Sequence, residues 1–389
     1  MRVFLCFFVF LMMSTGVCAA EPTVGAHAAI LMDFDSGRVL WEKNSDTALA
    51  MASTTKIMTA ILALESGRCD ETVTVSRLAA SAPKMKMYLS SGEKIRLGDL
   101  MLALMLESSN DAAVAIAEHL GDDVPSFCAM MTDKAREIGA KDTVFETPNG
   151  LDAGDHHSTA HDLALIARYA LEVPGFIELT NTQSAAFSSD KRSYSMQNKN
   201  RLLHEYSGAN GIKTGFTNKA GHCFVGAAKR DDMQLISVVL ASGWGDKGRS
   251  GKWIDTKAIL NYGFDTFSYE TIITQADPAG SVAVSRSRSP EVRYIYADKL
   301  RLPLSQSEKS QLEIKIEAPS TIPAPIKEGD TIGKANIYLA GQLYTTIELQ
   351  AAEPATRHDL KTSLEKVTSQ WLSQALNEPV QLILPEFPF

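Results

Sequence analysis

Apolar residues recur along this 389-residue chain with two different periods, and the period changes near residue 270. In the first region they recur every three or four positions, which is typical of helices with a buried face. This spacing predicts helices over residues 53–66, 97–106, 110–120 and 159–172. In the second region apolar and polar residues alternate strictly, as in Leu312–Glu317, which is typical of strands.

Strands are also predicted at both ends of the first region. Ala28–Phe34 and Arg38–Glu42 flank a short Asp-Ser-Gly turn and form a predicted hairpin. Gly221–Ala228 and Met233–Ala241 are separated by only four residues, so we expect them to be antiparallel neighbours. A sheet that draws strands from both ends of a region, with helices between them, is a layered α/β domain, which we place at residues 21–270.

The strict alternation after residue 270 predicts a second, smaller β domain over residues 275–353. Ala335–Leu339 and Leu343–Ile347 form its clearest predicted hairpin. A proline-rich stretch inside this domain is predicted to be a loop. Its prolines are Pro319, Pro323 and Pro325.

The chain begins with Met1 and the basic Arg2, continues with an apolar stretch over Val3–Met13, and then has small residues that end at Ala20. This pattern is typical of a secretory signal peptide, so we expect residues 1–20 to be removed on export. Lipid attachment at Cys18 is an alternative, although the bulky Val17 stands where a small residue is expected.

Charge and cysteine content narrow the class of protein further. The chain has a formal net charge of −8, which argues against nucleic acid as a partner. Only Cys69, Cys128 and Cys223 follow the signal peptide, and an odd, sparse set argues against a disulfide scaffold. A bridge between Cys69 and Cys128 is left open.

Ser53 and Lys56 are the first candidate for chemistry, because a hydroxyl and an amine three residues apart share one helical face. A lysine activates a serine only when burial or another cation keeps its amine neutral. Apart from Lys56, the segment from Ser53 to Leu64 has no charge, proline or glycine, so we expect Lys56 to be buried. The same spacing occurs in four surface-like contexts: Ser81/Lys84, Ser91/Lys94, Ser188/Lys191 and Ser363/Lys366.

Two polar triplets stand beside this pair as further candidates. Ser108-Ser109-Asn110 lies between two apolar helical segments, and Lys213-Thr214-Gly215 precedes the antiparallel strand pair. Taken alone, the first triplet is equally consistent with a helix cap and the second with a surface loop. Together and in this order, behind a signal peptide, the three motifs indicate a single active site.

With these motifs the chain resembles the penicillin-recognising serine enzymes, and among them the low-molecular-mass penicillin-binding proteins that are D-alanyl-D-alanine carboxypeptidases. The resemblance extends to Thr147–Asp152, Lys219–Gly221, Lys247–Arg249 and the small β domain. It implies a penicillin-binding/β-lactamase-like α/β fold, with helices on both faces of an antiparallel sheet, followed by an all-β domain.

The resemblance also implies what the protein does and where. It implies a serine-type carboxypeptidase that removes the terminal D-alanine from peptidoglycan stem peptides ending in D-Ala-D-Ala. Penicillin and other β-lactams would bind and inhibit it, and no cofactor is expected. The enzyme would act outside the cytoplasm, at the outer face of the bacterial cell membrane or in secreted form.

Each motif residue has an implied role in acyl transfer. Ser53 would attack the carbonyl between the two D-alanines, and Lys56 would take its proton. Lys213, close to Lys56, would keep that amine neutral by repulsion between like charges. Ser108 would pass the proton to the departing amine, and Asn110 would bind both the substrate backbone and Lys56.

Substrate binding is implied for the residues around the third motif. Thr214, together with Lys213, would hold the terminal carboxylate, and Gly215 would let the peptide lie along the strand edge. Backbone N–H groups of Ser53 and Phe216 would hold the oxyanion.

Arg249 follows the run Gly243–Gly248, which spells the G-x-G-x-x-G of dinucleotide sites. Such a site needs a parallel βαβ unit, whereas the preceding strand is predicted to pair antiparallel. In the family pattern this arginine helps to recognise the substrate carboxylate, and a solvated surface position is the alternative.

A histidine-rich segment also suggests a metal site, because His157 and His161 are four residues apart. Thr159 and Asp162 have the spacing of a capping box ahead of an apolar helix. Capping explains more of these residues than ligation does, so no metal is expected.

Two alternative functions share the same motifs. A secreted β-lactamase needs a carboxylate to activate the deacylating water, and Glu146, three residues before Asn149, is the nearest candidate. The class A pattern sets its Glu and Asn four residues apart, so we expect slow deacylation of penicillin. A catalytically idle penicillin-binding scaffold is the second alternative.

The C-terminal segment, residues 357–389, is predicted to contain an amphipathic helix whose apolar face could lie on a membrane surface, as in family members. Packing of this helix on the β domain is the alternative. The residues on that face are Leu360, Leu364, Val367, Trp371 and Ala375.

Overall fold

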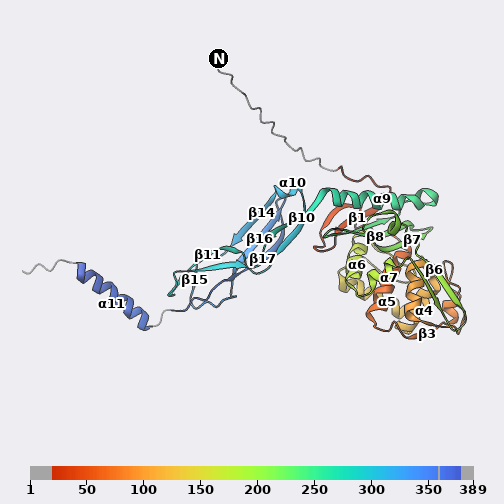
Figure 1. Cartoon of the computed structure of the whole chain (residues 1–389), viewed down its shortest axis with the longest axis horizontal. Coiled ribbons are helices and arrows are strands. Elements are labelled where there is room, and N and C mark those ends of the chain that lie inside the picture. Colours follow the sequence, from red (N-terminus) through yellow and green to blue (C-terminus); the bar gives the residue numbers. More distant parts are fainter. Residues whose placement is uncertain (1–19, 358–359, 378–389) are drawn as a thin grey trace, which may run out of the picture. The chain divides into compact units, whose positions relative to one another are not determined.

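The structure, a computed structural model, describes residues 20–357 and 360–377. The chain divides into two compact units, and the division falls between Ser268 and Tyr269. Figure 1 draws the helices and strands of both units. Each unit has its own hydrophobic core. Of the predicted signal peptide, all but Ala20 lies outside the described residues.

The first unit is built on a five-stranded sheet in which all neighbouring strands are antiparallel. The strand order is β2-β1-β9-β8-β7, so strands from both ends of the unit lie side by side, as predicted. The edge strand β7 is not among the predicted strands. Glycine and polar residues dominate it, and it has no alternation of apolar and polar positions. The strands are β1 (Ala28–Asp33), β2 (Val39–Lys43), β7 (Ala209–Thr217), β8 (Gly221–Arg230) and β9 (Met233–Leu240).

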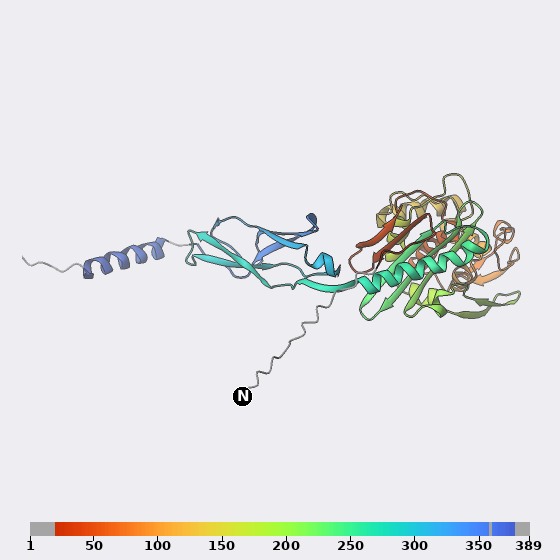
Figure 2. The same ribbon diagram turned by 90° about the horizontal axis from the view of Figure 1, so that it is seen from above.

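Helices cover both faces of this sheet, which confirms the predicted layered fold. Helix α9 packs on β8 and β9 at one face, while α6 packs on β1 and β9 at the other, on the same side as α4 and α5 (Figures 1 and 2). Because both faces are covered, every residue of β9 is buried. The long helices are α1 (Lys56–Glu65), α4 (Asn110–Gly121), α5 (Val124–Ile138), α6 (Ala160–Glu172) and α9 (Gly245–Thr266).

Two predicted helices contain tighter or wider turns than an α-helix. Ser53 lies in a 3₁₀ turn, η1 (Ala52–Thr55), and α1 begins only at Lys56. The segment 97–106 starts as α3 (Leu97–Leu102) and continues as a π turn, η2 (Ala103–Glu107), a feature often found next to functional sites. The short elements are β3 (Thr72–Thr74), α2 (Arg77–Ala80), β4 (Lys94–Arg96), α7 (Phe176–Asn181), β5 (Ser184–Ser188), β6 (Ser193–Gln197) and α8 (Leu202–Glu205).

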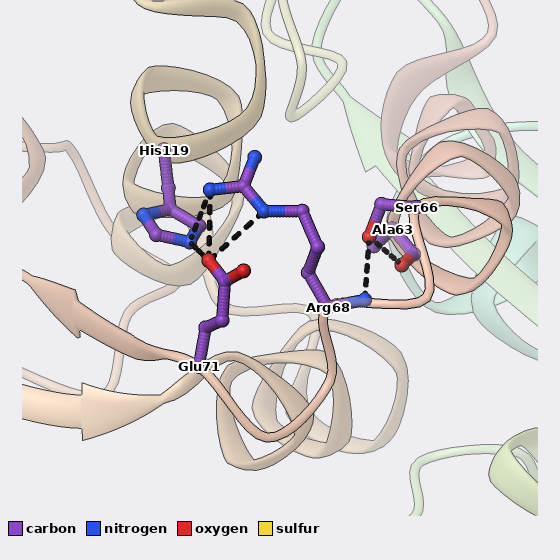
Figure 3. A network of polar contacts seen from close by, with 5 residues as sticks. All are labelled: Ala63, Ser66, Arg68, Glu71 and His119. Carbon is purple, nitrogen blue, oxygen red and sulfur yellow. Dashed lines mark hydrogen bonds and ion pairs between the residues drawn. The ribbon is translucent and has the colours of Figure 1, made fainter.

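A polar network on the surface ties the segment after α1 to the end of α4 (Figure 3). The Glu71 carboxylate accepts a hydrogen bond from Arg68 Nε at 2.9 Å and lies 3.0 Å from His119 Nε2. These partners, Arg68 first, lower the pKa of Glu71. The network therefore links the end of α1 to the end of α4. Lys56 and Asn110 lie at the opposite ends of these two helices, where the helices begin.

The second unit contains a six-stranded sheet of order β14-β16-β17-β12-β11-β15 and a two-stranded pair, β10 with β13. The predicted hairpin is present as β16 and β17. The proline-rich stretch is predicted to be a loop, but part of it forms the short edge strand β15, which includes Pro323 and leaves Pro319 and Pro325 outside; at an edge a proline needs no ladder partner. The elements are β10 (Phe267–Ile273), β11 (Pro278–Ser285), β12 (Glu291–Tyr296), β13 (Leu300–Ser305), α10 (Gln306–Lys309), β14 (Leu312–Glu317), β15 (Thr321–Pro323), β16 (Thr331–Leu339) and β17 (Gln342–Ala351).

The C-terminal segment forms helix α11 (Leu360–Asn377), at the position of the predicted amphipathic helix. Its apolar side chains Leu364, Val367 and Trp371 are exposed, the last of them by 76%. Among the described residues, no helix combines the length and the apolar character needed to cross a bilayer.

Candidate active site

Ser53 and Lys56 lie together at the start of the first long helix. Lys56 is fully buried, and its Nζ lies 2.9 Å from Ser53 Oγ. The backbone of Ala52 has a φ of +49°, a left-handed value that an alanine rarely adopts, so the chain is bent sharply just before the serine. The bend presents Ser53 at the edge of the core while Lys56 stays inside it.

Two other oxygens complete the surroundings of Lys56. Its Nζ lies 2.9 Å from Asn110 Oδ1 and 2.5 Å from the backbone oxygen of Asn149. Both are carbonyl oxygens, which only accept hydrogen bonds, so a neutral amine gives them its two hydrogens. Its lone pair then faces the Ser53 hydroxyl, the one neighbour that has a proton to give. This arrangement suits Lys56 to act as a base.

Asn110 is held in the orientation that this arrangement requires. Its Nδ2 donates to the backbone oxygens of Pro83 and Lys84, at 3.2 and 3.1 Å, which leaves Oδ1 directed at Lys56. The neighbouring Asp111 accepts from the backbone N–H groups of Met87 and Leu89, so the first residues of α4 fasten the loop 83–89 beside the site. Asn110 is therefore not a helix cap: it is the first residue of α4, and its side chain is used to orient Lys56.

Burial lowers the pKa of Lys56 well below its ordinary value of 10.5. Repulsion from Lys213 is the next cause, and attraction from the buried Asp111 partly opposes both. The sequence predicts the repulsion, but the larger cause is the loss of water around a side chain with no exposed surface.

Lys213 is itself almost fully buried, and its pKa is lowered to about 7. Burial is the main cause, followed by repulsion from Lys252, a buried residue of α9. Lys252 is not predicted as a site residue, because it belongs to none of the three motifs. The sequence could indicate it only as a lysine in a helix that packs on the sheet.

The third motif lies inside β7, and β7 is an edge of the sheet. A Cβ on Gly215 would lie 3.0 Å from the backbone nitrogen of Ser53 and 3.1 Å from the backbone oxygen of Met51. Any larger residue would push the strand away from the serine. Glycine at this position therefore lets β7 and the turn that carries Ser53 meet backbone to backbone.

Phe216 is 46% exposed, and its ring centroid lies 4.4 Å from that of His222, its partner on β8. Arg249, in the first turns of α9, is also exposed and lies 3.5 Å from Asp246. Within the described part of the chain, no hydrogen bond or ion pair joins Arg249 to Thr214. Its charge does reach His222, whose pKa falls to about 4 mainly through burial and then through Lys252 and Arg249.

Ser108 follows the π turn and has a φ of +65°, so the chain reverses there before α4 begins. The side chain is half-buried. The neighbouring Ser109 takes the N-cap position of α4, although its hydroxyl does not cap the helix. Strained backbone is common at functional sites, and it distinguishes Ser108 from Ser109 within this triplet.

The loop 147–151 supplies a backbone contact that sequence reasoning missed. Its turn is closed by Thr147, whose hydroxyl accepts from Gly150 N and donates to Leu151 O, both at 3.1 Å. Thr59 of α1 donates to Pro148 O at 2.7 Å. These bonds hold the Asn149 oxygen against Lys56. In the sequence, the only indication that Asn149 has a role is its position in a family motif.

The acidic and histidine residues nearby have structural partners. Glu146 accepts from the backbone N–H of Asp155 at 3.0 Å. Thr159 caps α6 through the N–H of Asp162, as predicted, and that carboxylate accepts from Asp142 N and Thr143 rather than closing a capping box. Within the described residues, no group of three metal-ligating side chains is found.

His156 supports the turn that carries Ser53. Glu146 N donates to its Nδ1 at 3.0 Å, so its proton is on Nε2, which lies 2.8 Å from Thr55 Oγ1. Thr55 in turn donates to Ala52 O at 2.8 Å. Burial is the main cause that lowers the pKa of His156 to about 4, so the ring is neutral at physiological pH.

Comparison with known proteins identifies both units. The profile of the Peptidase S11 family, described as D-alanyl-D-alanine carboxypeptidase, matches residues 15–243. The profile of the C-terminal domain of penicillin-binding protein 5 matches residues 267–357.

Individual relatives agree with both profiles. The D-alanyl-D-alanine carboxypeptidase DacF of Bacillus subtilis is 28% identical over 364 residues, which cover 92% of each chain. DacC of Escherichia coli, a carboxypeptidase of the same description, is 31% identical over 86% of each chain. The crystal structure of penicillin binding protein 5 from Haemophilus influenzae superposes with a TM-score of 0.74 at 27% identity, over 87% of this chain and 100% of that one. The chain therefore belongs to the Peptidase S11 family of serine-type D-alanyl-D-alanine carboxypeptidases, with the C-terminal domain of penicillin-binding protein 5.

Proposed function

We propose that Ser53 is the nucleophile of this carboxypeptidase and that Lys56 is its base. The observation that carries the proposal is the buried Lys56 amine, 2.9 Å from Ser53 Oγ, with carbonyl oxygens at its two other contacts. A neutral lysine needs no further partner to accept the serine proton.

The reaction follows from this geometry. Ser53 Oγ bonds to the carbonyl carbon between the two D-alanines as its proton moves to Lys56 Nζ. The C–N bond then breaks, the proton passes through Ser108 to the departing amine, and D-alanine leaves. Water later attacks the acyl-enzyme, returns the proton to Ser53 and releases the shortened peptide. Backbone N–H groups of Ser53 and Phe216 stabilise the oxyanion, each contributing roughly 3 kcal/mol.

The terminal carboxylate of the substrate is assigned to Lys213 and Thr214 on β7. A peptide lying along this edge strand pairs with its backbone groups, and the Lys213 ammonium supplies the charge that a free carboxylate requires. Arg249 is assigned to the same carboxylate from the start of α9. Its guanidinium is exposed and pairs with the exposed Asp246, so it is available to turn toward the substrate.

The decisive experiment measures D-alanine release from a peptide that ends in D-Ala-D-Ala, together with inhibition by penicillin and mass-spectrometric mapping of the labelled residue. We expect the label on Ser53 and no release by Ser53→Ala. As a matched control, Ser91→Ala changes the serine of another Ser-x-x-Lys spacing and should release D-alanine at the wild-type rate. Label on any serine other than Ser53 would refute the assignment.

Penicillin is expected to remain bound as a stable acyl-enzyme. A β-lactamase must activate water against this ester, and the Glu146 carboxylate is instead bonded to the backbone of Asp155. Rapid turnover of penicillin by the purified protein would contradict the carboxypeptidase assignment and favour a β-lactamase.

We also propose that the protein is exported and that α11 holds it on the membrane surface. Exposed apolar side chains on this helix support binding to the lipid interface. Flotation with liposomes tests this, because deletion of residues 357–389 should abolish it. Unchanged flotation would favour a helix that packs on protein.

A further inference from the structure

A cavity of about 490 Å³ opens at one end of the five-stranded sheet, where β7 and β9 end and β1 and β8 begin. His27, Lys43, Lys219 and Trp244 are among the residues that line it. No residue assigned above to catalysis or carboxylate binding lines this cavity. Nothing in the reaction as described so far uses it.

The cavity is nevertheless lined by residues that are close in sequence to the active site. Ala50, which lines it, precedes Ser53 by three residues, and Lys219 follows Phe216 by three. This inference rests on the proposed function, because the proposed substrate contacts decide which side of the scissile bond faces the cavity.

The proposed contacts set the direction in which the substrate runs. With its carboxylate at Thr214 and its scissile carbonyl at Phe216 N–H, the peptide runs antiparallel to β7. Residues upstream of the scissile bond therefore extend past Thr217, toward the cavity. Since a strand advances about 3.4 Å per residue, the residue before the two D-alanines is the first to lie beyond Phe216, toward this end of the sheet.

The walls of the cavity carry positive charge. Lys43 and Lys219 line it, and none of its lining residues is acidic. Lys43 Nζ donates to the backbone oxygens of Val24 and Ala26, at 3.0 and 2.8 Å, so its position is fixed. No ion pair found within the described residues involves the exposed Lys219. Such walls favour an anionic group.

Trp244 adds an apolar surface of fixed orientation. It is 54% exposed, yet its Nε1 donates to Asn218 O at 2.8 Å. Gly221, with a φ of +66°, leaves room for the indole, since a Cβ there would lie 3.2 Å from the ring. An anchored and exposed indole suits contact with methylene groups.

We propose that this cavity is a substrate subsite for the side chain of the residue that precedes D-Ala-D-Ala, and that it selects side chains ending in a carboxylate. Lys219 pairs with that carboxylate, and Trp244 packs against the methylene groups that lead to it. The subsite thus discriminates between stem peptides whose third residue is lysine and those whose third residue is a diamino dicarboxylic acid.

Two acetylated tripeptides, X-D-Ala-D-Ala, test this. In one, X is lysine; in the other, X is diaminopimelic acid, which is lysine with a carboxylate added to its terminal carbon. We expect kcat/KM to be about fivefold higher for the second, a ratio that corresponds to about 1 kcal/mol for a partly exposed ion pair. Lys219→Ala should bring the ratio toward one, and Lys219→Glu should bring it below one.

Lys229→Ala is the matched control, because Lys229 is exposed at the opposite end of β8 and its loss changes the net charge equally. It should keep the wild-type ratio. Thermal unfolding verifies that each variant is folded, and Trp244→Ala should raise KM for the diaminopimelic peptide more than for the lysine peptide.

The outcomes separate this inference from the proposed function. A ratio that stays at the wild-type value in both Lys219 variants, with D-alanine still released, overturns the subsite and leaves the carboxypeptidase assignment intact. Release of D-alanine from neither peptide refutes the proposed function, and the subsite with it.

Discussion

Replacement of Gly150 by alanine should disable the base without touching any catalytic side chain. A Cβ at this position would lie 1.9 Å from the backbone oxygen of Ala52, and φ at Gly150 is +82°. Both obstacles involve backbone, so no side-chain rotation relieves them. The loop 147–151 must move away from the turn of Ser53, and the Asn149 oxygen must leave Lys56.

The structure sets the size of the effect. A buried amine that loses one of its acceptors is destabilised by about 1–3 kcal/mol. If this loss falls on the acylation step, the rate drops by roughly 5- to 150-fold. The left-handed φ adds a separate loss of about 1–2 kcal/mol in stability, which has no direct bearing on chemistry.

Gly139→Ala separates the two contributions. Gly139 has a φ of +98° at the end of α5, and no atom lies within 4 Å of the position of a Cβ. It should therefore show the stability loss alone. The assay is the rate of acylation by a fluorescent penicillin after rapid mixing, with thermal unfolding of both variants.

The result that refutes the reasoning is a folded Gly150→Ala protein that is acylated at the wild-type rate. The Asn149 oxygen would then have no part in orienting Lys56. Equal slowing in Gly139→Ala would also refute it, because the effect would then follow from lost stability.

Four further predictions concern charge and packing at the site. The pKa of Lys213 is lowered to about 7, so its ammonium loses a proton as the pH rises through that value, and kcat/KM should fall there. The value of kcat should fall less, because the bound substrate carboxylate keeps the proton on Lys213. Lys252→Met removes a repelling cation and should move this fall to higher pH, as a pH profile would reveal. Asn110→Asp places a carboxylate beside Lys56, raises the pKa of that amine and should shift the rising, acidic limb of the penicillin acylation profile to higher pH; an unshifted limb would contradict the role of Lys56 as base. His156→Leu leaves Thr55 Oγ1 and Glu146 N without their histidine partner and should lower the free energy of unfolding by about 1–3 kcal/mol, measured in urea. His157 is only half-buried and contacts Asp155, so His157→Leu should lower it less.

The local pattern of residues predicts much of this molecule because helices and strands bury one face at a fixed period. The buried helix behind Ser53, the sheet built from both ends of the first unit and the hairpin of the second all follow from that periodicity. The expected burial of Lys56 follows in the same way, since a single lysine in an otherwise apolar helical stretch is buried together with its apolar neighbours.

Other features depend on neighbours that are remote along the chain. The acceptor that completes the surroundings of Lys56 is a backbone oxygen at Asn149, and every residue has such an oxygen, so no side-chain pattern marks it. The same holds for Lys252, whose charge matters only because α9 packs on the sheet near Lys213. β7 carries no periodic signal, yet it pairs with β8 and places its third-motif residues along an open edge.

Local periodicity and motif order thus determine the fold class, the family and the pair of residues that we propose to react. Which groups surround that pair, how far its pKa values move and which cavity adjoins it are decided by tertiary packing. The reason is physical: hydrogen-bond acceptors, desolvation and repulsion act through space over a few ångströms, and only the folded chain brings residues 53, 110, 149 and 213 within that range.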